Sequence, residues 1–191
     1  MSQIEQLKLQ LHSLPVSFKY PDNSRRRIRF GFATSMLVGS SAGPSTTDRS
    51  EGMPDMIGDA QELLTKVGQA LARSAPEGWR EMELRISDAG GMTGTVVTAT
   101  RGDGSVDRDC ELDDDSDDAA AELRESMYQQ GKGTWYNARL TLDSGGQLDA
   151  EFDYDNPPFD GDADPGLLIE DQRLYPSGAE LLPGWHPSRA G

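Results

Sequence analysis

The chain has 191 residues, 33 of them acidic and 18 basic, for a formal charge of −15. This length suits one ordinary domain with some additional sequence. The acidic balance argues against nucleic acid and anionic membranes as partners and favours a basic protein. A single cysteine, Cys110, excludes an intrachain disulfide and fits a reducing cytosol. No apolar run approaches the roughly 18 residues of a membrane span.

The first 55 residues have the composition of an extension. Residues 1–56 contain seven Lys/Arg and five Asp/Glu, whereas 57–191 contain eleven and twenty-eight. Three arginines precede the apolar stretch 28–38, as in a signal peptide, but they lie well inside the chain. Two interpretations stay open: a tethering extension, or sequence upstream of a true start at Met53 or Met56. In both cases we expect 1–55 to be flexible or dispensable, and deletion of 1–52 to leave the melting temperature nearly unchanged.

From residue 56 onward the apolar residues become periodic. Helical spacing predicts an amphipathic helix over 56–74, which Pro76 and Gly78 end. Alternation around Leu84 predicts a strand, 88–91 a turn, 93–100 a second strand, and 101–104 another turn.

An acidic stretch then leads into a second predicted helix over about 117–130, which Gly131 and Gly133 end. Two alternating runs around Ser144-Gly145-Gly146 predict a β-hairpin. The order helix, two strands, helix, two strands, Pro-rich tail predicts a single α+β domain over 56–191, an antiparallel sheet with helices packed on one face.

Ordinary catalytic groups are scarce. The two histidines lie near opposite ends, and the acidic neighbours of Cys110 should raise its thiol pKa, opposite to the needs of a catalytic cysteine. Asp160, Asp162, Asp164 and Asp171 have calcium-loop spacing, but Pro165 stands where such a loop needs glycine. We therefore predict no catalytic residue, no metal site and no cofactor. A hydrolase that uses two carboxylates is the enzyme alternative.

The last third of the chain combines carboxylates with aromatic residues, the combination with which a protein surface grips a basic partner. Alternation puts Asp149, Glu151, Asp153 and Asp155 on one face of the last strand, where they repel one another unless solvated or met by cations. The alternative is a tail that folds back over the sheet. The candidate partner-binding residues are Asp149, Glu151, Asp153, Asp155, Phe159, Asp160, Asp162, Asp164, Tyr175 and Trp185.

From residue 56 the chain resembles the YezG-like immunity proteins. The similarity rests on the opening helix with its Pro76-x-Gly78-Trp79 exit, the segment before Trp135, and Phe152-Asp153-Tyr154-Asp155 after the hairpin. In the tail it rests on Asn156-Pro157-Pro158, Tyr175-Pro176 and Leu182-Pro183-x-Trp185.

The resemblance implies a cytosolic bacterial antitoxin that binds a cognate toxin domain, often a nuclease, and neutralises it without catalysis. An acidic surface that fills the toxin's basic cleft agrees with this role. The alternative is a non-catalytic acidic binding or regulatory module for another basic partner.

Overall fold

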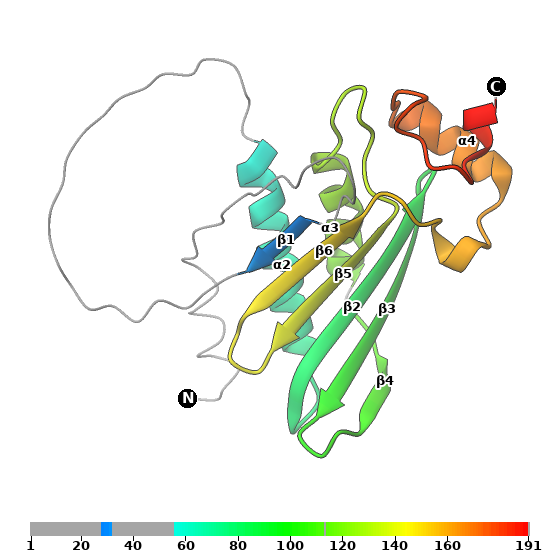
Figure 1. The fold of residues 1–191 in the computed structure, drawn as a ribbon. Coiled ribbons are helices and arrows are strands. Elements are labelled where there is room, and N and C mark those ends of the chain that lie inside the picture. The colour runs from blue at the N-terminus through cyan, green and yellow to red at the C-terminus, as the bar shows by residue number, and fades with distance from the viewer. Residues whose placement is uncertain (1–27, 32–55, 113, 191) are drawn as a thin grey trace, which may run out of the picture.

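A computed structural model describes residues 28–31, 56–112 and 114–190 of the chain. They form an antiparallel sheet with helices packed on one face, so the predicted α+β class is confirmed (Figure 1). The strands are β1 (Ile28–Gly31), β2 (Trp79–Ala89), β3 (Met92–Arg101), β4 (Val106–Cys110), β5 (Asn137–Asp143) and β6 (Leu148–Asp153). The helices are α2 (Met56–Ser74), α3 (Asp114–Ser126) and α4 (Pro165–Leu174), with short 3₁₀ helices η1 (Phe159–Gly161) and η2 (Pro187–Ala190).

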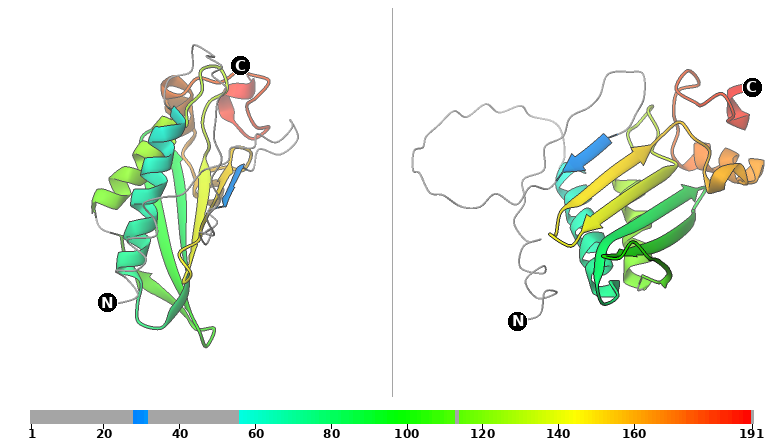
Figure 2. Two further views of the ribbon diagram at one scale, coloured as in Figure 1. Left: turned by 90° about the vertical axis from the view of Figure 1, so that its left-hand side faces the viewer. Right: turned by 60° about the horizontal axis from the view of Figure 1, so that its bottom comes forward.

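Helix α2 has the predicted bounds and supplies much of the core. Leu64, Val67 and Leu71 recur at helical spacing and are almost completely buried. Gly68 allows the helix to approach the sheet, because a Cβ there would lie 3.1 Å from Leu148 Cδ2 on β6. Figure 2 shows α2 and α3 covering the same face of the sheet.

The sheet has the order β1-β6-β5-β2-β3-β4, with every neighbouring pair antiparallel. The predicted β5–β6 hairpin is present. The two strands predicted on either side of the turn, β2 and β3, also pair with each other, and β2 pairs with β5 in the centre. The turn predicted over 88–91 is shorter than expected, because Asp88 and Ala89 belong to β2. Gly90 and Gly91 make the turn with φ of 58° and 82°, a region that glycine adopts easily.

The core lies between the sheet and the two helices. Its largest apolar side chains are less than 2% exposed and come from α2, α3, β2, β5, β6 and the segment before β5. They are Trp135, Phe152, Leu64, Leu71, Met82, Leu84, Ile86, Leu123, Leu140 and Leu142.

Strand β4 was not predicted. Its centre is Asp107-Arg108-Asp109, so apolar alternation is missing. Charged side chains are common on edge strands, where they discourage pairing with other chains. An ion pair joins β4 to β3, with Arg101 Nη2 2.6 Å from Asp107 Oδ2.

Two helical predictions also need correction. Helix α3 runs over 114–126 rather than 117–130, and the chain then forms an irregular loop through Gly131 and Gly133. The predicted Pro-rich tail contains α4. Asp164 caps that helix by accepting a hydrogen bond from the Gly166 amide at 2.7 Å, and Pro165 stands in the first turn, where proline is favoured.

The predicted extension over 1–55 lies outside the described residues except for β1. This four-residue strand pairs with β6, from Ile28 opposite Phe152 to Gly31 opposite Asp149. A short part of the extension therefore belongs to the sheet.

Candidate functional site

The face of the sheet opposite α2 and α3 carries the polar side chains of the strands. In β2, buried Leu84 and Ile86 alternate with the more accessible Glu83, Arg85 and Ser87. Directly opposed residues of antiparallel strands share a face, so the register extends this polar set across β3, β5 and β6. We call this surface the open face. On β2, β5 and β6 its charged residues are Glu81, Glu83, Arg85, Arg139, Asp143, Asp149, Glu151 and Asp153.

Two arginines stand at the centre of this acidic surface. Arg85 and Arg139 are directly opposite one another in the register. Arg85 Nε donates to Glu83 Oε1 at 2.7 Å, and Arg139 Nη2 lies 2.7 Å from Glu151 Oε2. Within the predicted acidic row, Glu151 is therefore met by a cation on the neighbouring strand.

One end of the open face contains a hollow of about 460 Å³. This volume lies within the range of about 300–1,000 Å³ found for ligand sites. Strands β2, β5 and β6 form its floor, and the chain after β6 forms its rim. It is lined by Arg85, Ile86, Ser87, Asn137, Ala138, Arg139, Glu151, Phe152, Asp153, Asn156 and Asp160.

Asn137 fixes the rim to the floor. Its Nδ2 donates to the carbonyl oxygens of Asn156 and Pro157, both at 3.1 Å. Its Oδ1 accepts a hydrogen bond from Ser87 Oγ at 2.7 Å. On the rim side, Asp153 Oδ1 accepts from the backbone amides of Asp155 and Asn156. The segment that follows β6 is therefore held across the end of the open face.

The rim then takes an unusual backbone path. Phe159 and Asp160 have φ of 53° and 54°, a region that few residues other than glycine adopt. Phe159 lies against Gly94 of β3, where a Cβ would be 3.3 Å from the ring. Asp160 is exposed and lines the hollow.

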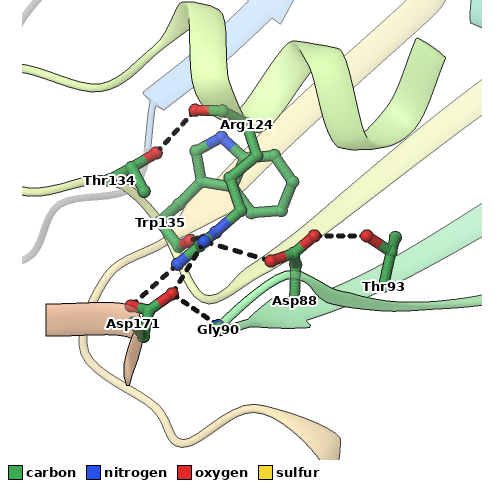
Figure 3. A network of polar contacts seen from close by, with 7 residues as sticks. All are labelled: Asp88, Gly90, Thr93, Arg124, Thr134, Trp135 and Asp171. Carbon is green, nitrogen blue, oxygen red and sulfur yellow. Dashed lines mark hydrogen bonds and ion pairs between the residues drawn. The ribbon is translucent and has the colours of Figure 1, made fainter. Parts of the chain in front are cut away.

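Behind this end of the sheet, a buried arginine joins three elements (Figure 3). Arg124 of α3 is 1% exposed. Its Nη1 lies 3.0 Å from Asp88 Oδ1 of β2 and 2.8 Å from Asp171 Oδ1 of α4, and its Nε donates to the Trp135 carbonyl at 2.7 Å. We call Asp88, Arg124 and Asp171 the buried triad.

Further contacts surround the triad. Thr93 Oγ1 donates to Asp88 Oδ2, and the Gly90 amide donates to Asp171 Oδ1 at 2.8 Å. A Cβ on Gly90 would lie 2.5 Å from the Leu167 carbonyl oxygen, so only glycine permits this approach of α4 to the β2–β3 turn. In α4 the buried residues are Leu168 and Asp171, so one of its two buried side chains makes an ionic contact.

The triad holds two carboxyl groups against one guanidinium. Burial raises the pKa of Asp88, while Arg124 and the Thr93 hydroxyl act in the opposite direction. Burial likewise raises the pKa of the neighbouring Tyr175 phenol and lowers that of the His186 imidazole. The common cause is that low-dielectric surroundings disfavour the charged form of each group.

Two of the three aromatic residues predicted as partner contacts, Tyr175 and Trp185, contact other residues of this protein. The Tyr175 ring lies 4.8 Å from the Arg124 guanidinium carbon, within cation–π range. Trp185 packs edge-on against Tyr136 with ring centroids 5.1 Å apart, and its Nε1 donates to the Asp155 carbonyl at 2.7 Å. Both contacts fit the alternative of a tail that folds back over the sheet.

The structure brings some of the candidate partner-binding residues together and separates others. Glu151, Asp153 and Asp160 line the hollow, and Asp149 lies on the same open face. The remaining acidic candidates follow the strand. Asp155, predicted on the same strand face, lies beyond β6, which ends at Asp153. Asp155 and Asp162 are exposed, and Asp164 caps α4.

Asp88, Arg124, Asp171 and the two open-face arginines were missed as site residues. Asp88 was assigned to a turn, and among possible sites Asp171 was considered for a calcium loop. For Arg124 a signal existed: it stands four residues after buried Ala120, beside Leu123, so it shares the inner side of α3. A basic residue on that stripe indicates a buried ion pair, but its partners are distant in sequence.

Two smaller sequence expectations can be compared with the structure. The pKa of the Cys110 thiol is raised as expected, with burial the largest cause and Asp107 the next. The four calcium-loop carboxylates do not form a loop, because Asp164 begins a helix and Asp171 lies on Arg124. Within residues 28–31, 56–112 and 114–190, no group of three or more His, Cys, Asp or Glu is placed to hold a metal ion.

Comparison with known proteins adds no assignment: no protein-family model matches the chain, and no curated protein matches it. Among the described helices, none combines the length and apolar character needed to cross a membrane.

Proposed function

We propose that this protein is an immunity protein, which binds a cognate toxin in the bacterial cytosol and neutralises it without catalysis. The observation that carries the proposal is the open face. It is a broad polar surface on a sheet whose other side is covered by helices. Strands β2, β5 and β6 contribute six carboxylates and two arginines to it, and these two arginines contact Glu83 and Glu151. The sequence resemblance to YezG-like immunity proteins supports the same role.

The mechanism is occlusion of a basic cleft. A nuclease binds the phosphates of its substrate with Lys and Arg side chains. An acidic surface that covers such a cleft competes with the substrate, and its charge speeds association with a basic partner. The acidic excess of the open face continues past β6 through Asp155, Asp160 and Asp162, all of which are exposed.

The proposal is tested by survival of cells that express the adjacent reading frame, with and without this protein. We expect the adjacent frame alone to be toxic, coexpression to restore growth, and the two proteins to elute as one complex from a sizing column. Toxicity without rescue would contradict the proposal.

The role of charge is tested by neutralising four carboxylates at once, in the variant D153N/D155N/D160N/D162N. A matched variant, D59N/E62Q/E122Q/E125Q, removes four exposed charges from the helical side. We expect the first variant to lose toxin binding and the second to retain it. Equal binding by both variants and the wild type would exclude the electrostatic mechanism.

A further inference from the structure

We propose that three side chains of the open face, Met92, Val96 and Phe159, form the apolar centre of the toxin-binding surface. We call them the apolar strip. Their counterpart on the toxin is a patch of apolar side chains bordered by basic ones. This inference rests on the proposed function and specifies which part of the open face contributes most to the affinity.

The first argument is where the exposed apolar side chains lie. Among the residues whose exposure is described, five large hydrophobic side chains are exposed, and Val96 and Met92 of β3 are the most exposed, at 58% and 56%. Val96 is directly opposite Arg85, and Met92 lies four residues earlier on the same strand, so both stand on the open face. A third, Val106 of β4, opposes Thr100 on that face. Exposed apolar side chains that gather on one face indicate an interaction surface.

The second argument is that the apolar surface is continuous. Met92, Gly94 and Val96 follow one another at every second position of β3, so they share the open face. Gly94 has no side chain, and the Phe159 ring lies in its place, because a Cβ on Gly94 would be 3.3 Å from the ring. The ring therefore fills the position between Met92 and Val96, and apolar atoms continue along the strand.

The third argument is the backbone at Phe159. Its φ of 53° is unfavourable for a bulky residue, because the Cβ atom crowds the backbone. Such strain persists only where the surrounding structure holds it, and it is concentrated at functional sites. Here the strained residue comes from the rim and brings its aromatic ring onto β3, where the ring remains partly exposed.

Charge distinguishes the toxin from a second copy of this chain as the occupant. A second copy would bring another net charge of −15 to the same face, whereas a basic toxin is attracted to it. Charged side chains border the strip, with Arg85 opposite Val96 and Glu83 opposite Thr98. An apolar centre within a polar border is the common arrangement of protein–protein interfaces.

The experiment measures the Kd of the protein encoded by the adjacent reading frame for two double variants. M92Q/V96T exchanges apolar side chains for uncharged polar ones of similar size, and threonine keeps the strand preference of valine. I169Q/L174Q makes a matched exchange at two exposed positions of α4, where glutamine suits a helix. All four positions are exposed, so the fold should tolerate both variants. We expect M92Q/V96T to weaken binding about tenfold or more and I169Q/L174Q less than about threefold. Equal effects of the two variants would overturn the inference.

Sodium chloride separates an apolar contact from an electrostatic one. Salt screens charges, so binding of the wild type to a basic partner should weaken as salt is added. The ratio of the Kd of M92Q/V96T to that of the wild type should stay constant, because an apolar contact is not screened. A ratio that falls to one at high salt would show that the substitutions act through the charged neighbours, and would overturn the inference.

The wild-type protein separates the inference from the function on which it rests. If wild type binds and rescues but M92Q/V96T binds equally well, only the apolar strip is wrongly assigned. If wild type neither binds nor rescues, the proposed function fails and the inference fails with it. Sedimentation of the protein alone should show a monomer. A dimer that M92Q/V96T dissociates would show that the occupant is a second copy and would overturn the inference.

Discussion

The two faces of the sheet use arginine in opposite ways. On the helix-covered side, Arg124 is 1% exposed and is surrounded by Asp88, Asp171 and the Trp135 carbonyl. On the open face, the side chains of Arg85 and Arg139 are 68% and 48% exposed, and each contacts a glutamate at the surface. Buried ion pairs are costly to break, whereas exposed ones contribute little to stability. We therefore expect loss of the covered arginine to cost far more stability than loss of either arginine on the open face.

The largest expected effect is that of Arg124→Met. The variant leaves two carboxyl groups without their cation in a buried site, so we expect the unfolding free energy to fall by about 3–5 kcal/mol. The matched change on the open face, Arg139→Met, should cost less than about 1 kcal/mol. Urea denaturation of both variants measures the difference. Similar losses for the two arginines would contradict the distinction between the faces.

Asp171→Asn should have the next largest effect. Asp171 accepts hydrogen bonds from the Gly90 amide and from Arg124 Nη2, and it lies within 2.8 Å of Nη1. The amide group of asparagine would place donor hydrogens against the guanidinium. We expect this to lower the unfolding free energy by about 1–3 kcal/mol. Hydrogen exchange should show faster opening of α4, while D162N, an exposed change in the same region, should leave α4 protected. Unchanged exchange in D171N would show that the triad does not hold α4.

Removing the edge strand β1 should have a smaller effect on the unfolding free energy. The sequence alone predicts that deletion of 1–52 has almost no effect, but β1 pairs with β6 over four residues. We expect the deletion to cost about 1 kcal/mol through lost ladder hydrogen bonds, or roughly 2–4 °C in melting temperature. A shorter deletion that removes residues 1–20 and retains β1 serves as the control. Identical melting temperatures for the wild type and the longer deletion would show that β1 adds nothing to stability.

Asp88→Asn should have the smallest effect, and its sign depends on pH. Burial raises the folded-state pKa of Asp88, so the folded protein loses stability as the pH rises from about 4 through that raised pKa. Asparagine does not ionise and escapes this loss. The stability of D88N relative to wild type should therefore increase between pH 4 and pH 7, as urea denaturation at each pH would show. If the stability of D88N relative to wild type fell over this range, the pKa of Asp88 would not be raised in the folded protein.

The features that sequence reasoning predicted are those set by local periodicity. Helix α2 follows from apolar spacing and the β5–β6 hairpin from alternation around a Gly-rich turn, and Asp149, Glu151 and Asp153 of the predicted acidic row share one face of β6. Strand β4 was missed because an edge strand with three successive charges has no apolar alternation. For α4 the start signal was present in Asp164-Pro165, but only two of its residues are buried, so its apolar stripe is weak.

The parts of the site that could not be predicted depend on contacts between distant residues. Arg124 and Asp171 are 47 positions apart, and Ser87 and Asn137 are 50 apart. Single-sequence periodicity does not report such pairs. The pairing of Glu151 with Arg139 becomes visible only once the strand register is known. The sequence alone predicts a uniformly acidic row, whereas the sheet presents a surface of mixed charge.

The most direct test of the open face as the binding surface is hydrogen exchange of the complex with the protein encoded by the adjacent reading frame. The account predicts new protection in β6, at the rim over residues 154–162 and at the β5 end near Asn137, with α2 and α3 unchanged. Protection confined to α2 and α3 would place the partner on the opposite side of the molecule and contradict the central claim.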